Sequence, residues 1–315
     1  MNGSETTEAT RLDGRVAADA IRTALVPRVD AFTTRSGRAP GLGILLAGDD
    51  GGSEIYVRNK VKACQEIGVD AGLRRLPVEA SLGDVMSIVA QFNADETVDG
   101  VLVQSPLPKG MGADAEQQVF DAIDPTKDVD GFNPVNVGRL WQHRPALAPG
   151  TPSGVMELLD RADISIEGRQ AVIIGRSDIV GKPMAALLLH RNATVTVCHS
   201  RTKDLPAVAS GADILVAAIG RPGFVTTDFV KPGATVIDVG TTRVTDRKRV
   251  ETLFGPASPR LEVLTRRGAT VVGDVHPDVS RVAGALTPVP GGVGPLTIAM
   301  LLSNTVRAAE LRQYA

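Results

Sequence analysis

Tyr56 and Lys60, two side chains able to do chemistry, stand four positions apart in residues 53–67. Helical periodicity places them on one face, beside an apolar stripe of Val57, Val61 and Cys64. A lysine beside apolar residues loses hydration, which lowers the pKa of its amine towards that of a useful general base. A surface lysine that covers a packed tyrosine with its alkyl stem has the same pattern, so this stretch alone leaves both interpretations open.

Gln104 directly follows residues 98–103, an apolar run that predicts a buried strand. Ligands of open α/β sheets bind beyond the carboxyl ends of strands, so Gln104 is a candidate ligand contact, with a turn-capping role as the alternative. The acidic loop 124–134 contains Asp128 and Asp130. It can present a carboxylate to a donor-rich ligand or form a plain surface turn.

Residues 171–190 have the pattern that opens a nucleotide-binding βαβ unit. A short apolar run (171–174) is followed by a turn from Gly175 to Gly181 and then by an apolar helix. Backbone N–H groups at the start of such a helix can hold a pyrophosphate. Ser177 stands where the motif G-x-G-x-x-G has its second glycine, so the turn alone also fits an ordinary tight turn.

The next predicted strand, 193–198, favours NADP over NAD. NAD-binding units place a carboxylate near the end of this strand, whereas this chain continues with His199, Ser200 and Arg201. Together with Arg176 in the turn, these hydroxyl and guanidinium donors suit a 2′-phosphate. We therefore predict NADP as the cofactor; the alternative is that the arginines are solvated loop residues.

Composition describes a globular protein without features of a nucleic-acid or membrane protein. The length of 315 residues suggests two domains, and the hydrophobic share of 43% is ample for buried cores. A net charge of −2 and 3% aromatic residues call for neither nucleic acid nor a membrane surface. No apolar run approaches the roughly 20 residues that span a bilayer.

Two further features indicate a cytoplasmic protein. Cys64 and Cys198 form no disulfide framework and no zinc cluster, which fits a reducing compartment. The opening sequence MNGSETTEAT has neither a basic start nor an apolar core, so we expect a short disordered polar tail rather than a signal peptide.

Periodicity predicts the remaining elements. Helices are expected at 12–34, 53–67, 81–93, 113–123, 151–161 and 296–311, and strands at 42–47, 69–76, 98–103, 171–174, 193–198, 212–218 and 233–239, with order resuming at 270–275. In the first helix, Pro27 predicts a kink or an early end, and Val16, Ile21, Leu25 and Val29 are expected to face inward.

Three irregular stretches separate these elements. Residues 141–150 are predicted to be a linker. The basic stretch 245–267 is predicted to be an irregular loop insertion. The glycine–proline loop 286–295 allows a backbone to approach a ligand closely.

Taken together, the motifs resemble the bifunctional methylenetetrahydrofolate dehydrogenase/methenyltetrahydrofolate cyclohydrolases of the FolD type. They occur in the order of that family and cover almost the whole chain after the N-terminal tail. The matching segments are SEIYVRNK (53–60), DGVLVQSPLP (99–108), KDVDGFNPVNVGRL (127–140), GRSDIVGKPMAALL (175–188), ATVTVCHSRT (193–202) and LTPVPGGVGPLTIAMLL (286–302).

The resemblance implies an α/β fold with two domains. An N-terminal α/β folate-binding catalytic domain, residues 1–148, is completed by the C-terminal helix within 288–315. A Rossmann-type parallel-sheet domain that binds NADP, residues 149–287, is inserted between them. The resemblance also implies a homodimer that acts on tetrahydrofolate derivatives in one-carbon metabolism, including purine biosynthesis. The sequence shows no compact cluster of acids and histidines, so we expect no metal.

The resemblance further assigns roles to individual residues. It makes Lys60 the central catalytic residue and Gln104 its hydrogen-bond partner, while Tyr56 stacks on the substrate and Asp130 binds the pterin. The implied substrate-binding loop is Pro290, Gly291 and Gly292. The implied cofactor contacts are Gly175, Arg176, Ser177, Ser200, Arg201 and Thr241.

These implied roles agree with elementary chemistry. A carboxylate such as that of Asp130 can accept from the amino group and the ring N–H of a pterin. Hydride removal from 5,10-methylenetetrahydrofolate leaves a methenyl cation, which a neutral Lys60 opposes less than a charged one. A neutral partner, Gln104, orients the amine without raising its pKa as a carboxylate would.

The sequence departs from the family pattern at Ser105, at Gly150, at Thr241–Thr242 and in the long stretch 245–267. A dehydrogenase with one activity and a non-catalytic folate- or nucleotide-binding regulator are the alternatives. A dehydrogenase for hydroxy or amino acids would usually need a histidine–carboxylate or lysine–aspartate pair in its cleft. A metal enzyme would need a compact cluster of acids and histidines. We expect the four histidines to be structural or solvated rather than catalytic; they are His143, His190, His199 and His276.

Overall fold

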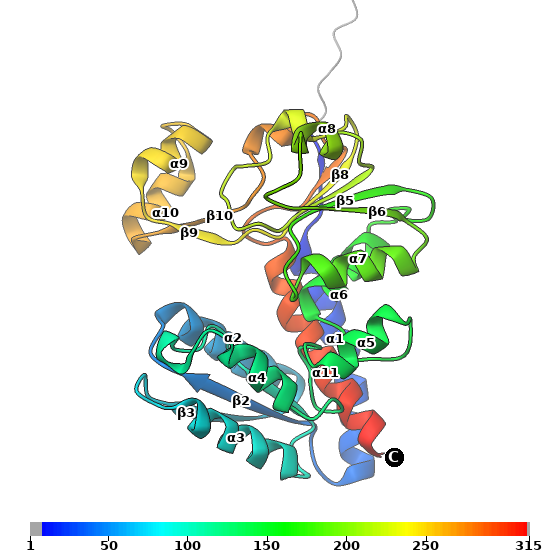
Figure 1. Cartoon of the computed structure of the whole chain (residues 1–315), viewed down its shortest axis with the longest axis vertical. Coiled ribbons are helices and arrows are strands. Elements are labelled where there is room, and N and C mark those ends of the chain that lie inside the picture. The colour runs from blue at the N-terminus through cyan, green and yellow to red at the C-terminus, as the bar shows by residue number, and fades with distance from the viewer. Residues whose placement is uncertain (1–7, 314–315) are drawn as a thin grey trace, which may run out of the picture. The chain divides into compact units, whose positions relative to one another are not determined.

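The computed structural model describes residues 8–313, and their contacts divide the chain into two compact units. Unit 1 comprises the described residues up to Ala17 together with Thr151–Leu296. Unit 2 comprises Ala18–Gly150 together with the described residues from Thr297 onward. Both units combine helices with a parallel sheet, so the predicted α/β class is confirmed (Figure 1).

Unit 1 is built on a six-stranded parallel sheet with the order β1–β11–β8–β7–β5–β6. Its strands are β1 (Thr10–Arg11), β5 (Gln170–Ile174), β6 (Thr194–Cys198), β7 (Ile214–Ala217), β8 (Thr235–Asp238) and β11 (Ala285–Leu286). Its helices include α6 (Gly150–Arg161), α7 (Gly181–His190), α8 (Leu205–Ala209), η2 (Thr227–Phe229) and η3 (Pro277–Arg281). Apolar runs such as β7 and β8 are buried throughout, as parallel strands covered on both faces require.

The N-terminal segment joins this sheet, which sequence periodicity did not predict. Thr10 pairs with Ala285, Leu12 N donates to Leu286 O at 2.9 Å, and Gly14 N donates to Gly291 O at 3.0 Å. These bonds attach residues 10–14 and 285–291 to unit 1. The predicted catalytic domain, which included residues 8–17 and 288–296, therefore differs from the observed division. The predicted disordered tail falls mainly on residues 1–7, which lie outside the described residues.

The prediction that residues 245–267 form an irregular loop is wrong. They hold α9 (Arg247–Phe254) and α10 (Pro259–Arg267), between the antiparallel strands β9 (Thr242–Val244) and β10 (Thr270–Val272). Asp246 and Ser258 cap the two helices. Their buried core consists of Val244, Val250, Leu261, Leu264 and Val272. The many charged residues on the exposed faces hide this short apolar stripe from a periodicity analysis.

Unit 2 is built on the parallel sheet β3–β2–β4, with strands β2 (Gly41–Ala47), β3 (Asp70–Leu76) and β4 (Gly100–Val103). Its helices are α2 (Gly51–Ile67), α3 (Leu82–Ala94), η1 (Lys109–Met111), α4 (Ala115–Ala122) and α5 (Pro134–Trp141), with the greater parts of α1 (Gly14–Ser36) and α11 (Val293–Gln313). Helices α3 and α4 share a core with one face of the sheet, to which Leu45, Val101 and Val103 contribute.

Helix α1 continues through Pro27 to Ser36, so the helix does not end early. Ile21, Leu25 and Val29 are buried as predicted. Val16 was also predicted to face inward, but it is 69% exposed. The buried stripe runs instead through Ala17 and Ala18, four and three positions before Ile21, and Val16 lies off it.

Candidate functional site

Lys60 and Gln104 meet within unit 2. Lys60 lies on α2, which begins where Asp50 Oδ2 accepts from Ser53 N at 2.7 Å and ends at Gly68 in the left-handed conformation. Gln104 is the first residue after β4, and the Lys60 amine donates to its Oε1 at 3.0 Å. Two candidates from separate elements therefore form one site.

Backbone contacts hold the Gln104 side chain in place. Gln104 N donates to Leu45 O at 2.9 Å, and Gln104 Nε2 donates to Ser105 O at 2.6 Å. With its amide group occupied, the side chain presents its oxygen to Lys60. The departure from the family pattern at Ser105 leaves this contact intact, because any residue supplies the same carbonyl oxygen.

Burial governs the ionisation of Lys60. The loss of hydration lowers the pKa of its amine, and the negative charge of Asp130 partly offsets this effect. The neighbouring Cys64 is buried, and burial raises the pKa of its thiol to about 12, which keeps it neutral. Lys60 is therefore more readily deprotonated than an ordinary lysine, as a general base requires.

Asp128 and Asp130 have different environments in the same loop. Asp128 is buried and accepts from Asn133 N at 2.8 Å, from Phe132 N at 3.2 Å and from Asn136 Nδ2 at 2.9 Å. Asp128 therefore shapes the loop. Burial raises the pKa of Asp130 to about 6, against the opposing attraction of Lys60. Asp130 is half-buried rather than fully enclosed, so it is the carboxylate of this loop able to meet a ligand.

Tyr56 lies one helical turn before Lys60 on α2 and is 50% exposed. An aromatic ring in this position can cover a planar ligand beside the amine. The helix thus carries both a stacking surface and a proton-transfer group, and the predicted stacking role of Tyr56 stays a prediction.

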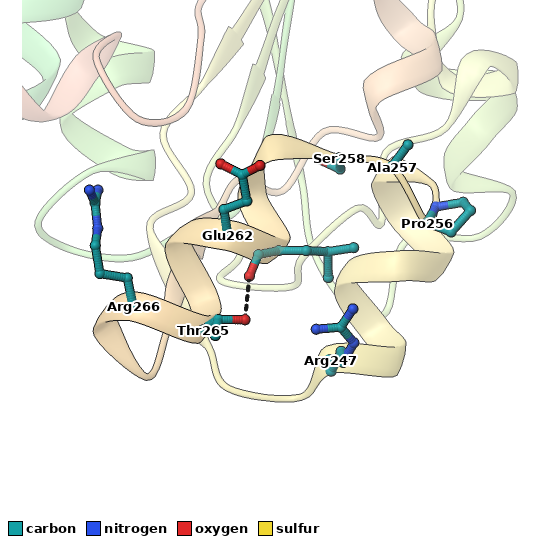
Figure 2. Close-up of a pocket in the computed structure, with 8 residues that line it drawn as sticks. Arg247, Pro256, Ala257, Ser258, Glu262, Thr265 and Arg266 are labelled. Carbon is teal, nitrogen blue, oxygen red and sulfur yellow. Dashed lines mark hydrogen bonds between the residues drawn. The ribbon is translucent and has the colours of Figure 1, made fainter.

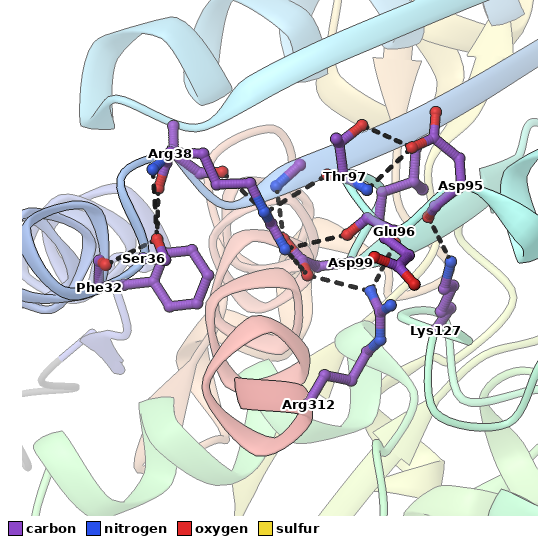
Figure 3. Close-up of polar contacts among 12 residues, drawn as sticks. Phe32, Ser36, Arg38, Asp95, Glu96, Thr97, Asp99, Lys127 and Arg312 are labelled. Atoms are coloured by element: carbon purple, nitrogen blue, oxygen red, sulfur yellow. Dashed lines mark hydrogen bonds and ion pairs between the residues drawn. The ribbon is translucent and has the colours of Figure 1, made fainter. Parts of the chain in front are cut away.

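Two charged residues that sequence reasoning missed hold the surrounding loops (Figure 3). Buried Lys127 donates to the carbonyl oxygens of Phe92, Asn93 and Asp95 at 2.9, 2.8 and 2.7 Å, at the end of α3. It thereby fixes the start of the loop that carries Asp128 and Asp130.

Buried Asp99 precedes β4 and receives both guanidinium nitrogens of Arg38, at 2.7 and 2.8 Å. Arg312 of α11 donates to the same carboxylate at 3.0 Å (Figure 3). This network ties the ends of α1 and α11 to the strand that positions Gln104. In the sequence, this role of Asp99 is indicated only by its position, as an acidic residue next to a wholly apolar strand.

The predicted nucleotide turn in unit 1 depends on backbone shape. Gly175 has φ +128°, and an added Cβ would lie 2.2 Å from Ala218 O. A Cβ on Gly181 would lie 2.3 Å from Gly175 O. Gly175 N donates to Cys198 O at 2.9 Å, which joins the turn to the end of β6. Neither glycine can be replaced without moving the turn.

Side chains around this turn are exposed, as ligand contacts would be. Arg176, Ser200 and Arg201 all point to accessible surface. The Ser177 hydroxyl accepts from Val180 N at 3.2 Å and Gly181 N at 3.3 Å, so it caps the start of α7. These residues can reach a phosphorylated ligand, and their contacts with a cofactor stay predictions.

The sequence also did not predict a pair of buried carboxylates that hold loops of unit 1. Asp274 accepts from the backbone N–H groups of Ile219, Gly220 and Arg221 at 2.7, 3.0 and 2.6 Å. Asp238 accepts from the backbone of Gly240, Asp274 and Val275 at 2.9, 2.8 and 3.0 Å, and burial raises its pKa to about 7. They hold the loops after β7 and β8, including the segment that carries the exposed Thr241.

The glycine–proline loop lies in unit 1 at the start of α11. Gly291 has φ +106°, and Gly292 N donates to Pro288 O at 2.7 Å. An added Cβ on Gly14 would lie 1.7 Å from Gly292 O, so the N-terminal segment packs directly on this loop. Pro290, Gly291 and Gly292 therefore belong to a different contact unit from Lys60.

A hollow lies on the α9–α10 hairpin, and none of the residues that line it is a predicted site residue (Figure 2). It is lined by Arg247, Pro256, Ala257, Ser258, Leu261, Glu262, Thr265 and Arg266. Arg247 pairs with Glu251 at 2.8 Å, and the Thr265 hydroxyl donates to Leu261 O at 3.0 Å. These bonds stay within the helices, so the hollow is not assigned to the site.

No helix among residues 8–313 combines the length and apolarity needed to cross a membrane. The same residues contain no group of three or more histidines, cysteines and acids placed to hold a metal ion.

Family models match both parts of the chain. The catalytic domain of tetrahydrofolate dehydrogenase/cyclohydrolase matches residues 12–130, and the NAD(P)-binding domain of the same enzymes matches residues 149–313. The chain belongs to the tetrahydrofolate dehydrogenase/cyclohydrolase family. The family resemblance of the motifs is thereby confirmed, and so is the prediction of an enzyme with a nicotinamide-nucleotide domain.

Relatives of this family cover the chain almost completely. It is 52% identical over 305 residues to the bifunctional protein FolD of Koribacter versatilis, covering 97% of this chain and 98% of that relative. The corresponding protein of Solibacter usitatus is 50% identical over 302 residues, covering 96% and 97%.

Solved structures of the family have the same fold. The bifunctional FolD enzyme of Campylobacter jejuni has a TM-score of 0.85 at 38% identity, covering 96% of this chain and 99% of that chain. The methylenetetrahydrofolate dehydrogenase-cyclohydrolase of Trypanosoma brucei, solved with NADP and an inhibitor, has a TM-score of 0.87 at 39% identity, covering 98% and 100%.

Proposed function

We propose that this enzyme oxidises 5,10-methylenetetrahydrofolate to 5,10-methenyltetrahydrofolate with NADP and hydrolyses the methenyl product to 10-formyltetrahydrofolate. The observation that carries the proposal is the 3.0 Å hydrogen bond from the Lys60 amine to Gln104, on an amine whose pKa burial lowers. An amine held by a neutral amide is suited to proton transfer near neutral pH.

In the hydrolysis, water adds to the methenyl carbon, and the bond from that carbon to N5 then breaks. Neutral Lys60 accepts a proton from the attacking water and passes it to the departing nitrogen, so one group serves as base and acid in turn; the remaining hydroxyl proton is released to solvent as the formyl C=O forms. Gln104 keeps the amine directed without adding a charge that would hold it protonated.

The same neutral amine suits the oxidation. NADP, when bound, supplies the hydride acceptor. The folate becomes cationic in this step, so a positive charge on Lys60 would raise the barrier. Burial of Lys60 favours the uncharged form and thereby serves both reactions.

Folate recognition is assigned to three groups. Ionised Asp130 accepts from the pterin amino group and ring N–H, and Tyr56 stacks on the folate. The backbone of Pro290, Gly291 and Gly292 forms a close approach to the substrate, which the left-handed φ of Gly291 makes possible. The accessibility of Asp130 and Tyr56 supports these roles.

The cofactor is assigned to the turn in unit 1. The tight glycines Gly175 and Gly181 fit a backbone cradle for the pyrophosphate, with Ser177 at the start of α7. Arg176, Ser200 and Arg201 are assigned to the 2′-phosphate of NADP, and Thr241 contributes through its backbone. Their exposure supports this assignment.

We further propose that unit 1 binds the nucleotide, that unit 2 provides the catalytic groups, and that the enzyme is a cytoplasmic homodimer serving one-carbon metabolism, including purine biosynthesis. Strand β6 is an edge strand with exposed Thr194, Thr196 and Val197, which supports pairing with a second copy. The net charge of −2 gives no reason to expect a nucleic-acid or membrane partner.

The testing experiment is a paired assay with the purified enzyme. Methenyltetrahydrofolate formation is followed with NADP and with NAD, and decay of added methenyltetrahydrofolate is followed separately. We expect turnover in both assays, with NADP preferred. Dehydrogenation without hydrolysis would identify a dehydrogenase of single activity, and folate binding without turnover would identify a regulator.

Lys60→Met tests the observation behind the proposal. Loss of the proton-transfer group is expected to lower the hydrolysis rate by about 10²–10⁴-fold. Lys62→Met is the matched control, because Lys62 is exposed on the same helix and pairs only loosely with Glu66 at 3.7 Å. Full hydrolysis by Lys60→Met would refute the assigned role.

A further inference from the structure

The α9–α10 insertion packs against loops at the carboxyl end of the unit 1 sheet. Leu253 of α9 contacts the loop after β7, where an added Cβ on Gly223 would lie 2.4 Å from Leu253 Cδ2. Gly223 N also donates to Gly273 O, just after β10, at 2.9 Å. Ligands of parallel sheets bind at the carboxyl end of the strands, so α9 and α10 pack against loops of the kind that bind ligands.

Arg260 connects the insertion to the loop that follows β11. It is the second residue of α10, and its Nη1 donates to Val271 O in β10 at 2.6 Å. Its Nη2 donates to the carbonyl oxygen of Val289, the residue before Pro290. The guanidinium carbon lies 4.2 Å from the centroid of the Phe254 ring, which fixes the fork from one side.

The chemistry of arginine suits this bridge. A guanidinium stays protonated and offers donors in a rigid plane, so one side chain can hold two carbonyl oxygens at once. The two carbonyls belong to segments that are separate in sequence, one in β10 and one just before the Pro290–Gly292 loop. Removing the fork leaves the Val289 carbonyl without this partner and frees the loop to move.

We propose that Arg260 is a positioning residue that holds the Pro290–Gly292 loop in its folate-binding conformation through the Val289 carbonyl. The inference rests on the proposed function, because it assigns that loop to the substrate. It gives the inserted hairpin a role in substrate affinity. The reacting groups, on α2 and directly after β4, make no contact with Arg260 among its hydrogen bonds.

Amide hydrogen exchange tests the bridge without any activity. We expect Arg260→Met to speed exchange at least tenfold in peptides that cover residues 287–293, with β5 unchanged. Arg267→Met is the matched control, because Arg267 is exposed on the same helix. We expect this control to exchange like the wild type.

Steady-state kinetics test the consequence for substrate. A loosened loop must be ordered on binding, so Arg260→Met is expected to raise the KM for methylenetetrahydrofolate about tenfold, with kcat and the KM for NADP within twofold of the wild type. A merely structural role would instead lower the active fraction and Tm while leaving the folate KM unchanged.

Wild-type exchange at 287–293 together with an unchanged folate KM in Arg260→Met would overturn the inference. If that variant does not fold, Arg260→Lys tests the inference instead, because a lysine ammonium cannot donate to both the Val271 and Val289 carbonyls as the planar guanidinium does. Intermediate loop exchange and folate KM are expected for Arg260→Lys, and wild-type values would refute the bridge. A wild type without dehydrogenase activity refutes the proposed function, while the exchange comparison still decides on Arg260.

Discussion

The Lys60 site and the Gly175 turn are constructed in opposite ways. At Lys60, a side chain on α2 meets a side chain after β4 at 3.0 Å, and the ionisation of Lys60 and Asp130 depends on burial and on mutual attraction. At Gly175, the backbone itself forms the feature, with φ +128° and no room for a Cβ. Changes of charge should therefore disturb the first region, and changes of shape the second.

This difference also separates the kinetic quantities that each region controls. The proton transfer proposed for Lys60 would enter the rate of the chemical step, so its loss should appear in kcat. The Gly175 turn is assigned to the cofactor, so its distortion should appear in nucleotide affinity and in stability. The predictions below test this separation, beginning with the largest expected effect.

Gly175→Ala is expected to abolish measurable NADP binding, because the new Cβ would lie 2.2 Å from Ala218 O. Nucleotide titration and urea unfolding measure the effect. Gly168→Ala is the control, since Gly168 has φ +72° with nothing within 4 Å of its added Cβ. The control is expected to lose only about 1–3 kcal/mol through backbone strain. Equal effects of the two changes would contradict a shape-determined turn.

Gln104→Glu is expected to slow hydrolysis at pH 7 about tenfold or more. A carboxylate beside Lys60 raises the pKa of the amine by about one to three units and thus reduces its neutral fraction. The pH–rate profile should shift to higher pH by the same amount, with activity recovered at alkaline pH. An unshifted profile would show that the charge of Lys60 does not govern the reaction.

Arg201→Ala is expected to lower the preference for NADP over NAD about tenfold, measured as the ratio of the two kcat/KM values. One hydrogen bond from a charged donor is worth roughly 1.5–3 kcal/mol. Lys203→Ala removes an exposed charge two residues away and serves as the control. An unchanged ratio in Arg201→Ala would indicate that Arg201 is a solvated loop residue.

Folate affinity is expected to weaken as the pH falls through about 6, the raised pKa of Asp130. The ionised carboxylate accepts the two pterin N–H groups, and protonation removes that capacity. At pH 5 about one-tenth of the sites remain ionised, so the folate KM should rise about tenfold. The KM for NADP is the internal control. An Asp130→Asn enzyme should show a high folate KM with no inflection near pH 6.

Prediction from the sequence succeeded where one element carries its own pattern. Parallel strands buried on both faces appear as continuous apolar runs, which is why β5, β7 and β8 were recognised. It failed for β1, which is too short to show a period, and for α9 and α10, whose charged faces conceal the core of Val250 and Leu261. Val16 shows the same limit, because a helical stripe is ambiguous within its first turn.

Candidate site residues could be named from the sequence where their types carry chemistry, as with Tyr56, Lys60 and Gln104; the structure brings Lys60 and Gln104 together, and the functional roles stay predictions. The supporting residues had no comparable signal. Asp274 and Lys127 are buried to serve backbone groups distant in sequence, and no spacing rule indicates which loop an acid or a lysine will reach. Arg260 likewise acts through Val289, which lies 29 positions away.

The sequence by itself determined the family and the α/β class, and it named candidate groups for proton transfer and nucleotide binding, because residue types and local periodicity can be read along the chain. Only the tertiary structure decided that Lys60 meets Gln104 and that Arg260 reaches the carbonyl before Pro290. It also decided that burial lowers the pKa of Lys60 and raises the pKa of Asp130. Distances and desolvation arise when separate segments pack together, and no single segment contains them.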